Sequence, residues 1–217
     1  MESWILSMND LEVSRLADAR RQTWSALYHI ADYIQVGMSE SEAIQIAQTT
    51  LREMGVKKFW HKCHVRFGRS TVSGYSDPYL DEVLRVDDIF LVDIGPVWGG
   101  MEGDAGATFI VGHNADMIRC QQAVKTIFES VESHWRENAV SGKKLYAFAE
   151  DEAKKHGYIL APSYVRGHRL SEFPHSFHSE LDVGDLDISP LPRQWVLEIH
   201  ICDPEMKFGA FYEDLLQ

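Results

Sequence analysis

Residues 87–112, around which the rest of the chain is organised, read D-D-I-F-L-V-D-I-G-P-V-W-G-G-M-E-G-D-A-G-A-T-F-I-V-G. Two apolar runs, 89–97 and 105–111, flank a glycine-rich turn, which is the pattern of a β-hairpin. Asp93 lies in the first run and Asp104 directly precedes the second. A turn centred on Trp98 and Gly99 would place these two carboxylates opposite each other, with Cβ atoms roughly 5 Å apart.

Two carboxylates so close repel each other unless a proton or a cation lies between them. A pair of divalent ions, typically about 3.5–4 Å apart in hydrolases, would bind both. A solvated acidic hairpin is the alternative, but apolar neighbours favour a buried site. Those neighbours are Leu91, Val92, Ile94 and Phe109. The hairpin therefore predicts a metal centre with further ligands elsewhere in the chain.

The composition is that of an ordinary globular domain, with 45% hydrophobic and 25% charged residues among 217. The net charge of −12 argues against a nucleic-acid or anionic-membrane partner, because phosphate binding requires clustered Lys and Arg. The three cysteines lack CxxC spacing, so neither a disulfide framework nor a structural zinc site is indicated. Neither a signal peptide nor an apolar run of roughly 20 residues is present. We expect a cytoplasmic protein, a monomer or a homodimer.

Helical patterns occur twice, each time followed by strands. Apolar residues recur at helical spacing over about 10–36, and Ser39 with Glu42 forms a capping box for a second helix that Gly55 closes. A strand-like segment, 58–72, leads to the hairpin. After the hairpin we expect a helix over about 114–137, a second helix between Ser141 and Gly157, and a strand over 158–164.

The two short helices begin 102 residues apart, which hints at an internal duplication with halves of about 10–112 and 113–217. Two unrelated helical hairpins of similar length would explain the spacing equally well. We expect one domain, 1–217, of the α+β class, with helices on the outer side of a strongly curved antiparallel sheet and the site on its inner face.

Three further candidate ligands lie in the last third of the chain. Glu198 interrupts the apolar strand pattern W-V-L-E-I-H-I-C, and Glu213 follows the pattern G-A-F-Y. A glutamate in such a run is unfavourable to bury unless it binds a cation or a partner. His168 follows a predicted strand and a glycine, where close approach to a site is possible. Two divalent ions would be balanced by one imidazole and four carboxylates, those of Asp93, Asp104, His168, Glu198 and Glu213.

The order of these residues resembles that of the pita-bread metallopeptidases, peptidase family M24, which includes methionine aminopeptidase, prolidase and Xaa-Pro aminopeptidase. The matching segments are V-D-I-G, G-D-A-G-A-T-F, G-H-R-L-S with His175 seven residues after His168, L-E-I, and F-Y-E-D. The resemblance covers residues from about 10 to 217, as the catalytic domain alone. It implies the pita-bread fold, with pseudo-two-fold halves.

The resemblance also implies roles. Asp93 would bind one metal, His168 and Glu198 the other, and Asp104 and Glu213 both. A water between the metals would become hydroxide and attack a peptide carbonyl, with Glu198 as general base and then acid. His175 would hydrogen-bond the substrate carbonyl or oxyanion. Oxygen-rich ligation suits Mn(II) or Fe(II), with Co(II) as a common substitute, and the implied substrate is a short peptide.

One departure from the family pattern concerns an upstream histidine that normally contacts the scissile amide. Tyr75 stands at the aligned position, where it would contact the substrate. A phenol can donate a hydrogen bond but does not carry a proton near neutral pH. His61 and His64 lie further upstream, and residues three apart on a strand point to opposite faces. Either would reach the site only with a different loop arrangement.

A second departure is Arg169, which follows His168 where a small residue is usual. It would be either a solvated charge or, together with Arg166, a binding group for a substrate carboxylate. Three functions remain open. They are a two-metal exopeptidase, a two-metal enzyme of non-peptide hydrolysis or iron redox chemistry suggested by Tyr75, and a silent binding module, which would be expected to lose ligands first.

Overall fold

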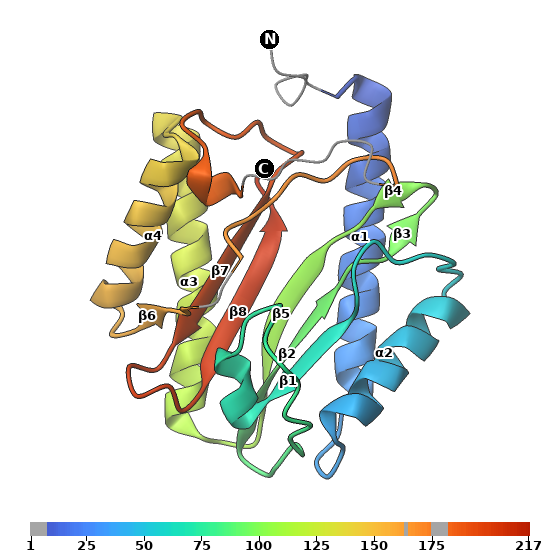
Figure 1. Cartoon of the computed structure of the whole chain (residues 1–217), viewed down its shortest axis with the longest axis vertical. Coiled ribbons are helices and arrows are strands. Elements are labelled where there is room, and N and C mark those ends of the chain that lie inside the picture. Colours follow the sequence, from blue (N-terminus) through green and yellow to red (C-terminus); the bar gives the residue numbers. More distant parts are fainter. Residues whose placement is uncertain (1–7, 163–164, 175–181) are drawn as a thin grey trace.

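The computed structural model describes residues 8–162, 165–174 and 182–217. Within them, six antiparallel strands form the main sheet in the order β1–β2–β5–β8–β7–β6, and four α-helices pack against it (Figure 1). The strands are β1 (His64–Phe67), β2 (Asp88–Ile94), β5 (Ala105–Val111), β6 (Ile159–Leu160), β7 (Val196–Cys202) and β8 (Gly209–Leu215), with a separate pair, β3 (Val97–Trp98) and β4 (Met101–Glu102). The helices are α1 (Asp10–Tyr33), α2 (Glu40–Glu53), α3 (Ala115–Asn138) and α4 (Gly142–Lys155).

The sheet consists of two halves with the same order of elements. The first half contains α1, α2, β1, β2 and β5, and the second contains α3, α4, β6, β7 and β8. Helices α1 and α3 have 24 residues each, α2 and α4 have 14 each, and the four longer strands have seven each. The halves meet where β5 pairs with β8, through Gly106 and Glu213.

Local sequence signals fix the helix starts. Asn9 caps α1, and Ser39 with Glu42 forms the predicted capping box at α2. Asn114 caps α3 through its side chain, whereas Ser141 precedes α4 without a side-chain cap bond. The buried helix faces form two cores, one against the first half of the sheet and one against the second.

Alternation along the strands separates the cores from the inner face of the sheet. Val92 on β2 packs in the first core, while its neighbour Asp93 lines a cavity. Leu197 on β7 packs in the second core, while Glu198 lines the same cavity. Successive side chains of a strand point to opposite faces, so the acids inside apolar runs reach the inner face. The helices and the curved antiparallel sheet form the α+β architecture expected from the sequence.

The register of the β2–β5 hairpin differs from the expected one. The turn between β3 and β4 is Gly99–Gly100, and both glycines have positive φ, 56° and 86°. Glycine adopts positive φ without strain, which favours this two-residue turn over one centred on Trp98 and Gly99. Asp93 therefore pairs with Gly106, and the expectation that it lies directly opposite Asp104 is wrong.

Two predicted strands are shorter in the structure. The segment 58–72 contains β1 only from His64, and a 3₁₀ helix, Gly68–Val72, follows it. Of the segment 158–164, only Ile159–Leu160 forms a strand, and residues 163–164 lie outside the described residues. Among the described helices, none is both long enough and apolar enough to cross a membrane.

Candidate metal centre

A single row of paired positions crosses the inner face of the sheet. The register pairs His64 with Asp93, Asp93 with Gly106, Gly106 with Glu213, and Glu213 with Glu198. Directly paired residues of an antiparallel sheet point to the same face. A Cβ added at Gly106 would lie 2.7 Å from Glu213 Oε1. The central glycine therefore leaves room for the carboxylate of Glu213.

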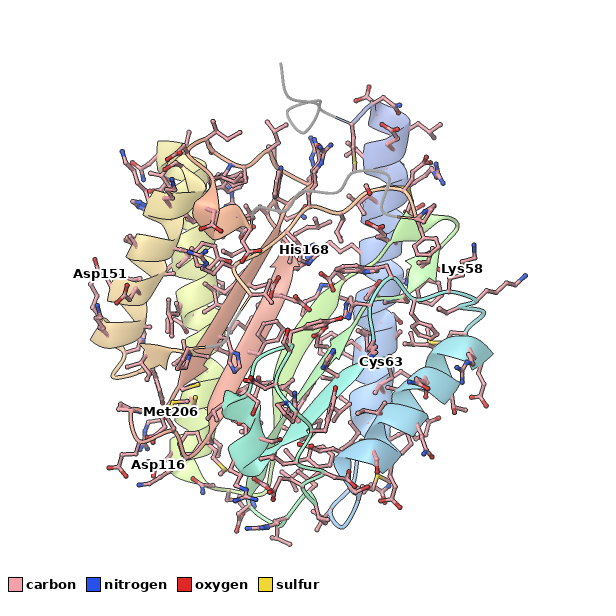
Figure 2. All side chains as sticks on the ribbon, viewed as in Figure 1. Lys58, Cys63, Asp116, Asp151, His168 and Met206 are labelled. Atoms are coloured by element: carbon pink, nitrogen blue, oxygen red, sulfur yellow. The ribbon has the colours of Figure 1, made fainter. Side chains whose placement is uncertain are left out.

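The row opens into a cavity of about 330 Å³. Figure 2 shows the labelled His168 among the side chains that lie over the central strands. A cavity of this size suits a small ligand. All five predicted metal ligands line it, namely Asp93, Asp104, His168, Glu198 and Glu213, and Tyr75 does so too.

Ligand atoms gather in two groups that share Asp104. Among the described residues, one group consists of His61, Asp93 and Asp104, and the other of Asp104, His168 and Glu213, with the ligand atoms of each group within 4.8 Å of one another. His168 Nε2 lies 2.8 Å from Asp104 Oδ2. Glu198 stands beside the second group, with Oε1 3.6 Å from His168 Nε2. The structure thus brings together all five predicted ligands and adds His61.

Burial makes it costly to ionise three of the four carboxyl groups. It raises the pKa of Glu198 to about 8 and the pKa of Asp93 to about 6. Burial and the charges of Asp104 and Asp93 raise the pKa of Glu213 well above its ordinary value. Asp104 behaves differently, because hydrogen bonds and charges from His168 and His61 outweigh burial and lower its pKa.

The two histidines beside Asp104 favour positive charge. Burial opposes the charged form of His61, but Asp93 and Asp104 outweigh it and raise its pKa to about 9. Burial likewise opposes the charged form of His168, but the hydrogen bond and charge of Asp104, with the charge of Glu198, raise its pKa to about 9. The cluster of carboxylates therefore attracts cations at both sides of Asp104.

The unpartnered oxygens of this cluster test whether it fits metal ions. Asp93 Oδ1 and Glu213 Oε1 are buried and accept no hydrogen bond from any described residue. A buried carboxylate oxygen without a donor is unfavourable, and a bound cation removes that cost. Carboxylate oxygen and imidazole nitrogen are ligands for first-row divalent ions. The donor set therefore fits divalent metals.

Tyr75 lies at the mouth of the cavity, with 44% of its surface exposed. Buried Arg66 donates to three backbone carbonyls of the loop 74–78 and so holds the segment that carries the phenol. Burial and the charge of Asp93 raise the pKa of Tyr75. Its hydroxyl therefore stays protonated at neutral pH and can act only as a donor or neutral acceptor.

Of the two remaining predicted site residues, one is described by the structure and lies outside the cavity lining. Arg169 is 5% exposed, donates from Nη2 to Gln194 Oε1 at 2.9 Å, and is absent from the cavity lining, so it is neither a solvated charge nor a wall of the site. The preceding Arg166 pairs with Asp185. His175 lies outside the described residues.

His61 was left out of the predicted ligand set, because we expected it to reach the site only with a different loop arrangement. The expectation that His61 and His64 point to opposite faces of one strand is wrong, because β1 begins only at His64 and both imidazoles line the cavity. Gly95 could have revealed it, since a Cβ there would lie 2.0 Å from His61 Cδ2. The glycine of the V-D-I-G segment therefore reserves space for an imidazole ring.

The amino-acid sequence matches the profile of a known protein family. The sequence profile described as metallopeptidase family M24 matches residues 14–215. The chain belongs to metallopeptidase family M24. It is therefore an enzyme of the metal-dependent hydrolase type, in agreement with the ligand pattern read from the sequence.

The chain covers different shares of the known proteins that it resembles. A methionine aminopeptidase of Clostridium acetobutylicum is 24% identical over 182 residues, 79% of this chain and 70% of that protein. The solved X-Pro aminopeptidase of Thermotoga maritima superposes with a TM-score of 0.76 at 19% identity, over 96% of this chain but only 58% of that one. The solved methionine aminopeptidase of Thermotoga maritima gives 0.77 at 15% identity, over 96% and 93%. These structures confirm the pita-bread fold.

Proposed function

We propose that the protein is a two-metal exopeptidase that acts on short peptides, of the aminopeptidase or Xaa-Pro dipeptidase type, with residues 1–217 as its single catalytic domain. The observation that carries the proposal is one cavity that contains the family's complete ligand pattern together with unpartnered carboxylate oxygens. Membership of a peptidase family favours peptide hydrolysis over the non-peptide or redox chemistry that Tyr75 suggests.

Five side chains would hold the metals in this proposal. Asp93 would bind one ion, His168 and Glu198 the other, and Asp104 and Glu213 would lie between them. When bound, the two ions would polarise a carbonyl oxygen and lower the pKa of a water molecule toward neutrality. Mn(II) or Fe(II) suits this oxygen-rich set best, and Co(II) is a plausible laboratory substitute.

Glu198 would carry protons during the reaction. A general base works best when its pKa lies near the working pH; burial raises the pKa of Glu198 to about 8 in the metal-free protein, and a bound cation would lower it from that value. The hydroxyl of Tyr146 donates to the Glu198 carbonyl at 2.9 Å and lies 3.2 Å from its backbone nitrogen, which fixes this part of β7. Glu198 would accept a proton from water and deliver it to the leaving amine.

Two further residues would contact the substrate. The Tyr75 hydroxyl would donate a hydrogen bond near the scissile amide, without taking part in proton transfer. His175 would stabilise the carbonyl or oxyanion, as its place in the family's motif suggests. The cavity of about 330 Å³ favours substrates of a few residues over folded proteins.

The test is a peptide-library assay. Protein loaded with Mn(II) or Fe(II) would be incubated with mixed di- and tripeptides, and the products would be identified by mass spectrometry. We expect release of single N-terminal residues or cleavage before proline, and loss of cleavage after chelation. Absence of cleavage from protein shown to contain two metals per chain would overturn the peptidase proposal.

A further inference from the structure

We propose that His61 is a sixth metal ligand, which binds through Nε2 the ion held by Asp93, so that each of the two metals carries one imidazole. This inference rests on the proposed two-metal site and deepens it. His61 is not among the five ligands that the motifs of M24 imply. Its assignment depends on contacts, orientation and packing in this chain.

The first observation is the arrangement around Asp104. His61 Nε2 lies 3.2 Å from Asp104 Oδ1, while His168 Nε2 lies 2.8 Å from Asp104 Oδ2. A carboxylate between two metals offers one oxygen to each of them, so each oxygen of Asp104 has its own imidazole nearby. His61 Nε2 is also 3.5 Å from Asp93 Oδ1, a buried oxygen without a hydrogen-bond donor. An ion between these three atoms would find its ligands already gathered.

The second observation is the orientation of the His61 ring. Its Nδ1 lies 2.7 Å from the Lys62 carbonyl oxygen, which can only accept a hydrogen bond. Nδ1 therefore carries the proton, and in the neutral imidazole the lone pair resides on Nε2, the atom that faces the carboxylates. Histidines that bind metals characteristically donate their other ring N–H to a carbonyl or a carboxylate in this manner.

The third observation is that His61 is held in place before any ion binds. The side chain is 7% exposed and packs over Gly95, where a Cβ would lie 2.3 Å from its Nε2. The Trp60 ring stands against it at 4.4 Å between centroids, and Trp60 Nε1 donates to the Gly103 carbonyl at 2.7 Å. The Trp60 backbone N–H also donates to the Gly95 carbonyl at 3.0 Å.

His64 provides a natural control. It is buried, lines the same cavity and pairs in register with Asp93. Its Nδ1, however, lies 2.6 Å from the Tyr79 hydroxyl. When that hydroxyl donates to Nδ1, the proton resides on Nε2, and His64 offers no lone pair to the cavity. We therefore expect His61 to bind metal and His64, three residues later, not to bind it.

The added nitrogen changes what the first metal would select. Imidazole suits Fe, Zn, Ni and Cu better than Mn, which carboxylates and water satisfy. Removal of His61 should therefore weaken binding of Zn(II) more than binding of Mn(II). It should also free a coordination position that water can fill.

The test follows the ring nitrogens by NMR. Full-length protein with isotope-labelled histidine would be titrated with Zn(II), and long-range proton–nitrogen spectra would report which imidazoles bind metal. The His61 resonances would be assigned with His61→Gln. Calorimetry on His61→Ala and His64→Ala would measure the two Zn(II) affinities. Loss of a residue that only supports a ligand typically weakens metal binding by about 10- to 100-fold, so His61→Ala should weaken one of the two affinities at least that much.

We expect two Zn(II) per chain, metal-dependent shifts of His61 Nε2 and His168 Nε2, and two unchanged affinities in His64→Ala. Two bound Zn(II) with no shift at His61 would overturn the inference and leave the two-metal site intact. Fewer than two bound Zn(II) would overturn the proposed site itself. The wild-type spectra decide between these results even if a variant fails to fold, because they count the imidazoles that respond.

Discussion

The two hairpins, β2–β5 and β7–β8, have strands of equal length but contribute differently to the site. In the shared inner row, the first hairpin pairs Asp93 with Gly106, and the second pairs Glu198 with Glu213. The glycine removes one side chain from the centre, and the Phe211 ring and the Glu213 carboxylate occupy the space. Two halves with the same order of elements thus build one asymmetric site through side-chain size.

The hairpins also differ in charge. In the metal-free protein, burial raises the pKa of Glu198 to about 8 and that of Asp93 to about 6, and in each case the charge of a neighbouring histidine, His168 or His61, opposes the shift. Near neutral pH the second hairpin therefore holds the group suited to exchange protons, and the first holds a carboxylate suited to stay ionised. This difference in proton exchange between the two hairpins can be tested.

The largest expected effect comes from Glu198→Gln. The amide keeps nearly the same size but cannot accept a proton, so kcat for peptide cleavage should fall by about 100- to 10,000-fold. Circular dichroism and thermal unfolding would check that the fold persists. Glu205→Gln, in the exposed turn between β7 and β8, is the matched control and should keep its turnover. Near-normal turnover in Glu198→Gln would contradict its role.

The stability of the metal-free protein should depend on pH through groups of both hairpins. Glu198 and Asp93 have raised pKa values when folded, so metal-free protein is stabilised at low pH and loses this stabilisation as pH rises through about 8 and about 6 respectively. Folding raises the pKa values of His61 and His168 from 6.5 to about 9, so these histidines also stabilise the folded protein at low pH. This stabilisation is lost as the pH rises toward 9. The lowered pKa of Asp104 acts only at acid pH.

We therefore expect the Tm of chelator-treated protein to fall between about pH 6 and pH 9, as measured by differential scanning calorimetry. Glu198→Gln should flatten the part of the fall below about pH 8, whereas Asp93→Asn should change that part less, because Asp93 titrates earlier. A Tm that rises across this range would show that the folded site binds fewer protons than the unfolded chain.

The smallest expected effect concerns the starts of the two short helices, each of which follows a serine. Ser39 accepts a hydrogen bond from the Glu42 backbone, whereas Ser141 makes no side-chain cap bond. Ser39→Ala should lower the free energy of unfolding by about 1 kcal/mol, and Ser141→Ala should lower it much less. Urea unfolding of both variants measures the difference, and equal losses would show that the cap bond is not what stabilises α2.

Much of this architecture follows from local sequence. The capping box at Ser39 and the apolar runs around Asp93 and Glu198 predict their elements, because each signal acts within a few residues. The turn lies one residue later than expected, which shifts the partner of Asp93 by two residues, since the choice between Trp98–Gly99 and Gly99–Gly100 depends on the turn geometry. Periodicity finds a strand more readily than it finds the exact residue at which the chain reverses.

The site was predicted less evenly. The acids were recognised as candidates because a charge inside an apolar run requires compensation, and they line one cavity in the structure. His61 was missed because the strand begins later than the pattern indicates, and only packing against Gly95 brings the ring to the carboxylates. Arg169 was misplaced because its partner, Gln194, lies 25 residues away and no local signal links them.

The position of the candidate metal centre at the junction of β5 and β8 has a consequence for assembly of the fold. Asp93 and Asp104 come from the first half, and His168, Glu198 and Glu213 from the second, so neither half holds a complete set of ligands. Ions bound there would stabilise only the docked arrangement of both halves, because the separated halves bind them more weakly. Metal binding would thus stabilise the contact between the two halves, and chelation should weaken the β5–β8 contact before either half unfolds.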